Sequence, residues 1–450
     1  MKMNVYFIGI GGIGMSAIAR YYHHAGAKVS GYDKTPSPLT DELQREGMEI
    51  HFEPSVEAIP TDLENTLVIY TPAIPDDMEE LLYVRERGYK IVKRSRALGE
   101  IAANKKTLAV AGTHGKTTTS TMLAHILTSS GEGATSFLGG ISKNYNTNLL
   151  LSQSDILVAE ADEFDRSFLQ LKPQIAVITS MDADHLDIYD NLENLRGAFN
   201  EFAMGVSDCI VVKKGLEEYL RGVTAKCYTY SYSEQGDFYP SDINVHKDGR
   251  ITFTLHLCND VIEGCTVGIP GKVNVENGVA AAAVAYLHGT PLEEIKSALG
   301  SFSGAKRRFD IRFENGEVLY IDDYAHHPQE LAASISSIKE IYPGRKLCAI
   351  FQPHLFSRTN DFYREFAQSL STADSVILLP IYPARELPIE GVTSELILDL
   401  ISHNQKKIVE KGELMEELRK REFDILVTFG AGDIDRFVEP IENLLRERYV

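Results

Sequence analysis

The sequence predicts an α/β protein of three domains, each built around a mostly parallel sheet. Its 450 residues correspond to about three domains of ordinary size. Three segments, beginning at Val5, Thr107 and Ile425, share one pattern: an apolar strand, a glycine-rich turn and then a helix. We interpret them as separate α/β units rather than as a short internal repeat.

The first predicted domain, residues 1–106, is Rossmann-like and begins with the strand at Val5. Its helix is expected over Ala17–Gly26, and its later strands at Lys28–Tyr32, Leu67–Tyr70 and Lys90–Val92. The domain ends at a polar segment, residues 103–106. Alternating strands and helices of this kind favour a parallel sheet.

The central domain, residues 107–303, is predicted to hold a parallel sheet with strands at Thr107–Ala111, Asp155–Ala159 and Gln174–Thr179. Between Ala225 and Pro270 the pattern changes to period-two alternation. Cys227–Tyr232 and Arg250–Leu257 alternate in this way, and Asp248-Gly249 is a hairpin signal. We therefore expect a small antiparallel addition, followed by a helix over Glu276–Leu287.

The third domain, residues 304–450, is again predicted to be Rossmann-like. Its strands are expected at Val318–Ile321, Lys346–Phe351, Ser375–Pro380 and Asp424–Phe429. Amphipathic helical patterns separate these strands, as in an open α/β sheet.

Composition excludes several classes of protein. With 44% hydrophobic and 24% charged residues, the chain is globular rather than disordered. A net charge of −19 argues against nucleic-acid binding and against binding to anionic membranes. No apolar run is long enough to insert into a membrane. Glycines within Val5–Ala19 also disfavour a signal peptide there.

The five cysteines lack CxxC spacing, so reduced, mostly buried thiols and a cytoplasmic location are expected.

The strongest local signal is Gly112-Thr113-His114-Gly115-Lys116-Thr117-Thr118, directly after a predicted strand and at the start of a helix. Such a turn wraps a phosphate with backbone N–H groups; the lysine reaches the terminal phosphates and the Thr117 hydroxyl binds Mg²⁺. Val110 stands where the full pattern has glycine. An ordinary tight turn is the alternative, but the strand–helix junction favours nucleotide binding.

Acidic residues follow two neighbouring strands of the central domain. One group is Glu160-Ala-Asp162-Glu163, and the other is Asp184-His185-Leu-Asp187. Ligands of open α/β sheets gather at the carboxyl ends of the strands, so Glu160 and His185 are expected to face the bound phosphates. Carboxylates suit Mg²⁺, whereas a histidine ligand is less expected. The alternative for His185 is a loop histidine that caps a helix, and for Asp187 we prefer helix capping.

A second glycine-rich turn lies near the N-terminus. Gly9, Gly11, Gly12 and Gly14 precede Asp33 by the spacing of a dinucleotide-binding motif. The motif predicts a diphosphate at a helix N-terminus with Asp33 near a ribose, but it does not distinguish NAD from a nucleotide sugar. Close packing of helix on strand is the structural alternative.

Three clusters stand out in the second half of the chain. Asn274-Val-Glu-Asn277 opens an alanine-rich helix, and Lys306-Arg307-Arg308-Phe309 follows the last domain boundary. Asp322-Asp323-Tyr324-Ala325-His326-His327-Pro328 ends a predicted strand. Acids, a tyrosine and histidines at a strand end can bind a ribose or assist a proton transfer.

Together these motifs resemble the Mur ligases over essentially the whole chain. The resemblance is carried by the Gly9–Ser16 turn, the 112–118 turn, Glu160–Glu163, Asp184–Asp187, Asn274 with Asn277, Arg307–Phe309, Asp322–Pro328 and Gln352-Pro-His354. It implies three domains, of which the first binds the UDP sugar, the central one ATP with magnesium, and the last the amino acid.

The resemblance also implies roles for individual residues. Lys116, Glu160 and His185 would be catalytic; Thr117 with Glu160 would bind one Mg²⁺, and Glu160 with His185 a second, with Mn²⁺ as an alternative ion. Asn277 would contact the adenine, Arg308 the terminal phosphate and Asp323 the ATP ribose. The UDP sugar would lie on Gly9, Gly11, Gly12, Gly14, Ser16 and Asp33. Tyr324, His326, His354 and Arg358 would line the amino-acid site.

Within the family, the chain resembles the branch that adds L-alanine to UDP-N-acetylmuramate through an acyl phosphate, in peptidoglycan precursor synthesis. Many of its members have arginine where this chain has Leu355, so Arg358 or Arg385 is expected to hold the amino-acid carboxylate instead. Asn200 stands where other Mur ligases carry a carbamoylated lysine, which is consistent with this branch. The substrates would be UDP-N-acetylmuramate, L-alanine and ATP, bound by a monomer or homodimer.

Three alternatives remain at this point. A ligase of the same family joins an L-alanyl peptide to UDP-N-acetylmuramate, but the cluster around His354 and the chain length argue against it. A dehydrogenase built on the first glycine turn leaves the second turn and Glu160 unexplained. A protein that binds ATP as a conformational switch, without joining substrates, would leave the first and last domains without a function.

Overall fold

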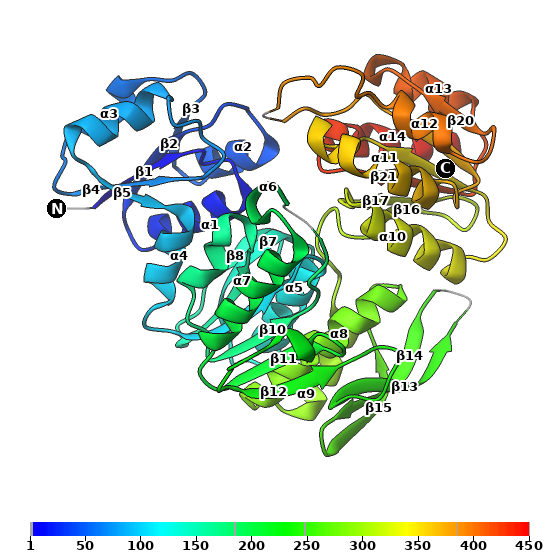
Figure 1. Cartoon of the computed structure of the whole chain (residues 1–450), viewed down its shortest axis with the longest axis horizontal. Helices are drawn as coiled ribbons and strands as arrows, with labels where there is room; N and C mark the ends of the chain where they lie inside the picture. Colours follow the sequence, from blue (N-terminus) through cyan, green and yellow to red (C-terminus); the bar gives the residue numbers. More distant parts are fainter. Residues whose placement is uncertain (1–2, 184–185, 247–248, 385, 450) are drawn as a thin grey trace. The chain divides into compact units, whose positions relative to one another are not determined.

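The computed structural model describes residues 3–183, 186–246, 249–384 and 386–449. Within these residues the chain folds into three sheets flanked by helices (Figure 1). It forms two compact units. One comprises Met1–Ile243, Thr252–Gly268 and Val275–Ser303, and the other Asn244–Ile251, Ile269–Asn274 and Gly304–Val450.

The first sheet is parallel throughout, in the order β3-β2-β1-β4-β5. Its strands are β1 (Asn4–Ile8), β2 (Lys28–Tyr32), β3 (Glu49–His51), β4 (Thr66–Tyr70) and β5 (Lys90–Lys93). Its helices are α1 (Ile13–His24), α2 (Pro38–Arg45), α3 (Glu79–Arg87) and α4 (Arg94–Ala102), with the 3₁₀ turn η1 (Val56–Ala58). The predicted strands are confirmed, but α1 begins four residues earlier than predicted, directly after the extended Gly12.

The central strand β1 is buried on both faces. Val5 and Phe7 belong to the core that also contains apolar residues of α1, α2 and α4. Tyr6 and Ile8 belong to a separate core with residues of α3. Burial on both faces explains why β1 is a continuous apolar run rather than an alternating one.

The central sheet has the order β15-β14-β13-β12-β11-β10-β6-β9-β7-β8. Its strands are β6 (Lys106–Ala111), β7 (Thr135–Ser142), β8 (Thr147–Leu150), β9 (Ile156–Ala161), β10 (Ile175–Ile178), β11 (Cys209–Lys213), β12 (Lys226–Tyr230), β13 (Phe238–Val245), β14 (Ile251–Leu257) and β15 (Asp260–Thr266). Its helices are α5 (Lys116–Ser129), α6 (Leu186–Tyr189), α7 (Leu192–Met204), α8 (Lys272–His288) and α9 (Leu292–Ser301), with η2 (Phe164–Gln170) and η3 (Glu217–Tyr219). Strand β6 lies between β9 and β10, both parallel to it, so three strand ends meet beside its turn.

An antiparallel addition is present, but one of its strands was misassigned from the sequence. The segment at 227–232 forms β12, which runs parallel to β11 and continues the main sheet. The strands of the addition are β13, β14 and β15, and β14 pairs antiparallel with β15. Alternation with period two indicates that one face of a strand is exposed. It does not indicate whether the neighbouring strand is parallel or antiparallel. Asp248 lies outside the described residues, and Gly249 next to it has φ +80°.

The third sheet has the order β16-β17-β21-β18-β19-β20, with β16 antiparallel to β17. Its strands are β16 (Asp310–Glu314), β17 (Leu319–Asp323), β18 (Leu347–Phe351), β19 (Ser375–Leu378), β20 (Lys406–Ile408) and β21 (Ile425–Phe429). Its helices are α10 (Pro328–Ile341), α11 (Phe356–Leu370), α12 (Glu395–Leu400), α13 (Leu414–Lys420) and α14 (Val438–Tyr449), with η4 (Lys411–Glu413) and η5 (Asp433–Phe437). Apolar residues of α10–α12 cover one face of this sheet, and those of α13 and α14 the other.

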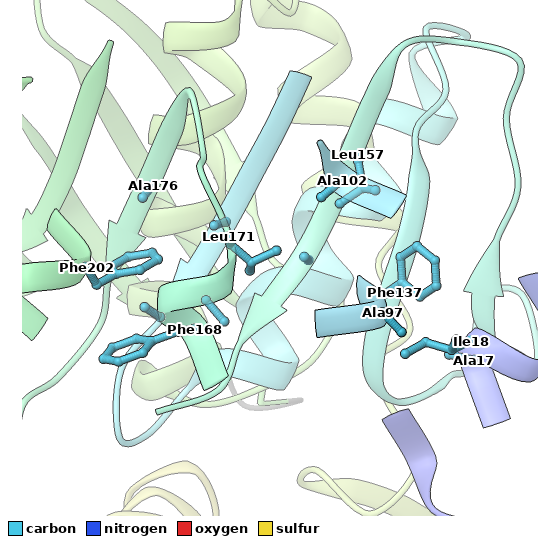
Figure 2. Packing of buried hydrophobic residues seen from close by; sticks show 14 of the residues in the cluster. Ala17, Ile18, Ala97, Ala102, Phe137, Leu157, Phe168, Leu171, Ala176 and Phe202 are labelled. Atoms are coloured by element: carbon cyan, nitrogen blue, oxygen red, sulfur yellow. The ribbon is translucent and has the colours of Figure 1, made fainter. Parts of the chain in front are cut away.

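One hydrophobic core continues from the first sheet into the central one. Figure 2 shows Ala17 and Ile18 of α1 beside Phe137 of β7, within the same cluster as Leu157 of β9. Tyr21 of α1 also contacts the Phe137 ring, with centroids 5.7 Å apart. The boundary near residue 106 is therefore crossed by continuous apolar packing.

Two smaller expectations can be compared with the structure. The five cysteines are free thiols, but only Cys265 and Cys348 are buried, so the expectation of mostly buried thiols is wrong. Over the described ranges, each helix is too short or too polar to cross a bilayer.

Candidate active site

The turn between β6 and α5, residues 112–115, depends on two glycines. Gly112 has φ +137° and Gly115 has φ +78°, values that other residues rarely adopt. A Cβ on Gly112 would lie 2.1 Å from Thr179 Oγ1, and one on Gly115 would lie 2.8 Å from Asn277 Oδ1. The turn therefore packs closely against neighbouring elements. It presents the N-terminus of a 14-residue helix, where backbone N–H groups and the helix dipole favour an anion.

The turn is anchored to the end of β10. Thr113 Oγ1 and Ser180 Oγ are hydrogen-bonded at 2.9 Å, and the His114 backbone N–H donates to Ser180 Oγ over 2.7 Å. Thr118, in the first turn of α5, is buried. These contacts fix the backbone of the predicted phosphate-binding turn against the neighbouring strand.

Lys116 begins α5 and is held by a buried carboxylate. Its Nζ donates to both oxygens of Glu163, over 2.9 and 2.7 Å, and to the carbonyl oxygen of Gly112 over 2.6 Å. Burial lowers the pKa of Lys116, but the carboxylates of Glu163 and its neighbours outweigh that effect and hold the pKa above its usual value. Burial also raises the pKa of Glu163 to about 7, against the attraction of Lys116.

Glu163 was not among the residues selected from the sequence. Glu160, Asp162 and Glu163 lie in one short segment, and the sequence does not indicate which of the three carboxylates pairs with Lys116. In the structure Glu163 is completely buried, and Tyr189 OH donates to its backbone carbonyl over 2.5 Å. Its burial next to Lys116 depends on the packing of β9 and η2, which the sequence pattern does not report.

Thr117 and Glu160, two predicted metal ligands, are in direct contact. Thr117 Oγ1 donates to Glu160 Oε2 over 3.0 Å. Gly139 of β7 leaves room for this carboxylate, since a Cβ there would lie 1.9 Å from Oε2. A hydroxyl and a carboxylate are the kind of hard oxygen ligands that Mg²⁺ prefers, and these two lie beside the predicted phosphate-binding turn.

His185, the third predicted ligand, lies outside the described residues. Across the described ranges, no group of three or more His, Cys, Asp or Glu side chains is arranged to hold a metal. Thr117 and Glu160 therefore offer two oxygen atoms beside the turn, and a cation held there would need further ligands such as water.

Asn277, predicted to contact adenine, lies in α8 next to the start of α5. Thr119 Oγ1 donates to Asn277 Oδ1 over 3.3 Å. The side chain is 7% exposed and stands directly behind Gly115. The structure therefore brings Asn277, Lys116, Thr117 and Glu160 together around one turn.

The first glycine-rich turn, residues 9–14, is organised around Asp33. Gly9 has φ +90°, and the Gly11 N–H donates to Asp33 Oδ2 over 2.7 Å. Gly12 is extended and immediately precedes α1. A Cβ on Gly14 would lie 2.4 Å from a guanidinium nitrogen of Arg94, the residue that opens α4. Asp33 thus supports the turn itself.

Arg94 was also not selected from the sequence, and in the structure its guanidinium lies next to Gly14 of the first glycine-rich turn. It pairs with Asp162 of the central domain at 3.0 Å. Burial raises the pKa of the Asp162 carboxyl, but Arg94 and Lys116 outweigh it and bring that pKa below its usual value. A charged pair therefore connects the first glycine turn to the acidic segment beside the second one.

Ser16, selected as a UDP-sugar-binding residue, is completely buried. Its Oγ donates to the Ile13 carbonyl over 2.9 Å and accepts from Asn148 Nδ2 over 2.9 Å. The hydroxyl is therefore engaged within the protein.

In the second unit, three of the residues predicted to line the amino-acid site lie together. The rings of Tyr324 and His326 are edge-to-face with centroids 5.2 Å apart, and His326 and His354 are 6.0 Å apart. His354 stacks on Tyr382 at 5.8 Å. The cluster lies at the carboxyl ends of β17 and β18, where ligands of open sheets bind.

Arg308 and Asp323, the predicted phosphate and ribose ligands, border the same cluster. The Arg308 guanidinium lies 4.7 Å from the centroid of the Tyr324 ring. Burial raises the pKa of the Asp323 carboxyl to about 6, although Ser334 Oγ donates to it over 2.7 Å and Arg308 attracts it. Burial therefore has a larger effect on the pKa of Asp323 than either the hydrogen bond from Ser334 or the charge of Arg308.

Arg358 lies in the first turn of α11, just after Leu355, which has φ +69°. A side chain not selected from the sequence, Glu386, caps this helix: it accepts from Ser357 N over 3.0 Å and from Ser357 Oγ over 2.5 Å. Arg385, the other candidate for carboxylate binding, lies outside the described residues. The N-terminus of α11 therefore already holds a carboxylate of the chain itself.

Fold and geometry define a P-loop enzyme with two further α/β domains. Known families match the same three segments: the Mur ligase family catalytic domain over residues 4–106, the Mur ligase middle domain over 110–285, and the Mur ligase glutamate ligase domain over 307–432. The chain belongs to the Mur ligase family.

Individual relatives agree with this assignment. A Porphyromonas gingivalis protein named UDP-N-acetylmuramate–L-alanine ligase is 52% identical over 451 residues, covering 98% of this chain and 99% of the relative. The crystal structure of UDP-N-acetylmuramate–alanine ligase MurC from Thermotoga maritima superimposes with a TM-score of 0.85 at 28% identity, covering 99% of this chain and 100% of that one. A murein peptide ligase from Psychrobacter arcticus shares the fold, with a TM-score of 0.71 at 23% identity over 98% of each chain.

Proposed function

We propose that this chain is a UDP-N-acetylmuramate–L-alanine ligase, which uses ATP to form an amide between L-alanine and the lactyl carboxylate of the sugar nucleotide. The observation that carries the proposal is the convergence of Lys116, Thr117 and Glu160 at one phosphate-binding turn. Near-full-length relatives at about 50% identity bear this name, which supports the L-alanine branch over the recycling of preformed peptides.

The reaction needs ATP because a carboxylate and an amine do not condense appreciably at neutral pH. The lactyl carboxylate attacks the γ-phosphorus of ATP, ADP leaves, and an acyl phosphate forms. The L-alanine amine, as free base, then attacks the acyl carbon, and inorganic phosphate leaves from the tetrahedral intermediate. Water must be excluded while the acyl phosphate exists, since it would otherwise be hydrolysed.

In the first step Lys116 would exchange its carboxylate partner for a phosphate oxygen. The ammonium group already lies at the N-terminus of α5, so the exchange needs a change of side chain rather than of backbone. Thr117 and Glu160 would hold Mg²⁺, and His185 with Glu160 a second ion, with Mn²⁺ as an alternative. A bound divalent cation would supply neutralisation of phosphate charge.

For ATP we propose contacts with the turn at 112–118, with Asn277 at the adenine, Arg308 at the terminal phosphate and Asp323 at the ribose. For the sugar nucleotide we propose the turn at 9–14 with Asp33. Tyr324, His326, His354 and Arg358 would receive L-alanine. Burial keeps the Asp323 carboxyl partly protonated near its pKa of about 6, so we expect ribose binding to weaken below that pH.

The division into domains at 1–106, 107–303 and 304–450 is part of this proposal, one domain for each substrate. The proposal also places the enzyme in the cytoplasm, where its nucleotide substrates are made, as a monomer or homodimer. Its partners would be small molecules.

One assay tests the proposal. Phosphate release is measured with ATP, Mg²⁺ and UDP-N-acetylmuramate, adding L-alanine, an L-alanyl tripeptide or no acceptor. We expect release with L-alanine, together with formation of UDP-N-acetylmuramoyl-L-alanine. Release that depends on the tripeptide instead would identify a peptide-recycling ligase, and release without any acceptor would contradict ligase activity.

A further inference from the structure

Asn148 is a buried polar residue of the central domain whose side chain reaches into the first domain. It lies on β8, the edge strand of the central sheet, and is completely buried. A buried amide is costly unless its hydrogen-bonding groups are satisfied. Here they are satisfied by α1, the helix that follows the first glycine-rich turn.

Three hydrogen bonds link Asn148 to α1. Its Nδ2 donates to the carbonyl of Ile13 over 2.7 Å and to Ser16 Oγ over 2.9 Å. Its Oδ1 accepts from Arg20 Nη1 over 2.5 Å. Both donors of the amide and one acceptor lone pair are thus used, two of them within the first turn of the helix.

Arg20 extends this network on the first-domain side. It is 5% exposed, and its guanidinium pairs with Glu46 at 2.7 Å and with Glu42 at 3.1 Å. The side chain is therefore held on both sides, by two carboxylates near the end of α2 and by the Asn148 amide. Apolar packing surrounds the network, since Ala17 and Ile18 lie against Phe137 (Figure 2).

The hairpin that carries Asn148 also borders Glu160, the carboxylate that lies beside the second glycine turn. Strand β8 pairs with β7, and β7 pairs with β9. Gly139 of β7 is the residue that makes room for Glu160 of β9. One hairpin therefore contacts the carboxylate proposed to hold the metal and the helix proposed to bind the diphosphate of the sugar nucleotide.

We propose that Asn148 is a positioning residue for the sugar nucleotide: it fixes the start of α1, and through it the backbone N–H groups of the 9–14 turn, relative to the central domain. This inference rests on the proposed function. A turn that is already ordered binds its ligand without a further loss of conformational freedom. Ser16 belongs to the same device, because its hydroxyl is bound by Asn148 and by the carbonyl of Ile13.

The test compares substrate affinities of purified full-length variants. In Asn148→Ala the two bonds to the start of α1 are lost, and we expect the Kd for UDP-N-acetylmuramate to rise about tenfold or more. The Kd for ATP with Mg²⁺ should change less than about twofold, because the second turn keeps its contacts. Calorimetry gives both constants, and circular dichroism establishes that the variants are folded.

A second variant covers the case in which Asn148→Ala does not fold. Asn148→Asp keeps the size of the side chain and the acceptor for Arg20, but it removes the amide donor to the Ile13 carbonyl. We expect the same selective loss of sugar-nucleotide affinity. The matched control is Lys93→Ala, which removes another link between the first and central domains, the exposed pair with Asp165 at 2.8 Å. That variant should bind both substrates like the wild type.

A double-mutant cycle separates positioning from a merely structural role. If Ser16 acts through Asn148, the effects of Ser16→Ala and Asn148→Ala on the Kd for UDP-N-acetylmuramate are not additive. Additive effects, equal weakening of both substrates, or unchanged sugar-nucleotide affinity in folded variants would each overturn the inference. Failure of the wild-type protein to bind UDP-N-acetylmuramate would instead contradict the proposed function.

Discussion

The two glycine-rich turns of this chain share a strand–turn–helix order but lie in different electrostatic surroundings. Each follows a central parallel strand and opens a helix of at least twelve residues. The turn at 112–115 is followed by Lys116, beside the buried Glu163 and close to Glu160. In the turn at 9–14 the first helical residue is the apolar Ile13, and the carboxylate of Asp33 accepts a hydrogen bond from the backbone of the turn.

Under the proposed function, this difference separates binding a phosphate from reacting at one. Backbone N–H groups and a helix dipole are sufficient to bind a diphosphate that stays intact. Transfer of a phosphoryl group also needs positive charge beside the phosphate. Among the described residues near either turn, only the second turn is followed by a lysine and by a hydroxyl–carboxylate contact. The first turn instead has a cation supplied by a neighbouring helix, Arg94, which is already paired with Asp162.

The largest expected effect comes from removing the charge that distinguishes the turns. Lys116→Ala should lower kcat by about a thousandfold or more, because charge on the transferred phosphoryl group loses its stabilisation. The Kd for UDP-N-acetylmuramate should change less than about twofold, as measured by calorimetry. Lys213→Ala, which breaks a partly exposed pair with Glu276, is the control and should remain active. Loss of sugar-nucleotide binding in Lys116→Ala would show that the turns do not act separately.

The buried Glu163 beside the second turn should make the stability of the folded protein depend on pH. Its pKa in the folded protein is about 7, against 4.5 for an ordinary glutamate. The folded state therefore retains a proton that the unfolded state releases between these values, so this group favours folding at low pH and opposes it as pH rises to 7. At about 1.4 kcal/mol per unit, the change approaches 3 kcal/mol.

Glu163→Gln removes this titration. Relative to the variant, the wild-type free energy of unfolding should fall by about 3 kcal/mol between pH 4.5 and 7, measured by urea denaturation without nucleotide. Glu276→Gln serves as the control for loss of a lysine–carboxylate pair. A wild-type stability that rises over this range relative to Glu163→Gln would mean that the attraction of Lys116 outweighs burial.

Gly139 leaves the space that the Glu160 carboxylate occupies beside the second turn, and a substitution there would fill this space. In Gly139→Ala the new methyl group would fall 1.9 Å from Glu160 Oε2 and displace it. We expect kcat to fall about a hundredfold and the activating Mg²⁺ concentration to rise, as followed by phosphate release. Gly197→Ala in α7, where a Cβ meets nothing within 4 Å, should leave both unchanged. An unaltered Mg²⁺ requirement in Gly139→Ala would argue against Glu160 as a metal ligand.

The smallest effect concerns Asp33 at the first turn. Asp33→Ala removes the acceptor of the Gly11 N–H, so we expect the Kd for UDP-N-acetylmuramate to rise about tenfold with ATP binding unchanged. Asp33→Asn retains an oxygen acceptor and should lie closer to wild type. Equal losses in the two variants would mean that the negative charge, rather than the hydrogen bond, is what the turn requires.

Much of this architecture could be predicted because it depends on local patterns. The strand Lys28–Tyr32 was placed to the residue, because strands and helices alternate regularly along this part of the chain. Lys116, Thr117 and Glu160 were selected because glycine turns and strand ends have fixed chemistry. In the structure Thr117 donates to Glu160, and Lys116 lies next to Thr117 at the start of the same helix, but their roles stay predictions.

What could not be predicted depends on contacts between distant segments. Asn148 is an ordinary polar residue in a short strand, and its role follows only from the position of α1 against β8. Glu163 and Arg94 carry no motif that separates them from neighbouring charged residues. The misassignment of the strand at 227–232 has the same origin, since strand pairing is decided by the whole sheet.

The β7–β8 hairpin has a consequence for attempts to recombine members of this family. By chain position, the first domain ends near residue 106, but the hairpin beyond that point completes its interior through Phe137 and Asn148. A chimaera that exchanges only residues 1–106 would set a foreign helix against this hairpin and leave a buried amide without its partners. Exchanging residues 134–150 together with the first domain would keep the junction intact, so a transplantable module consists of two separate stretches of chain.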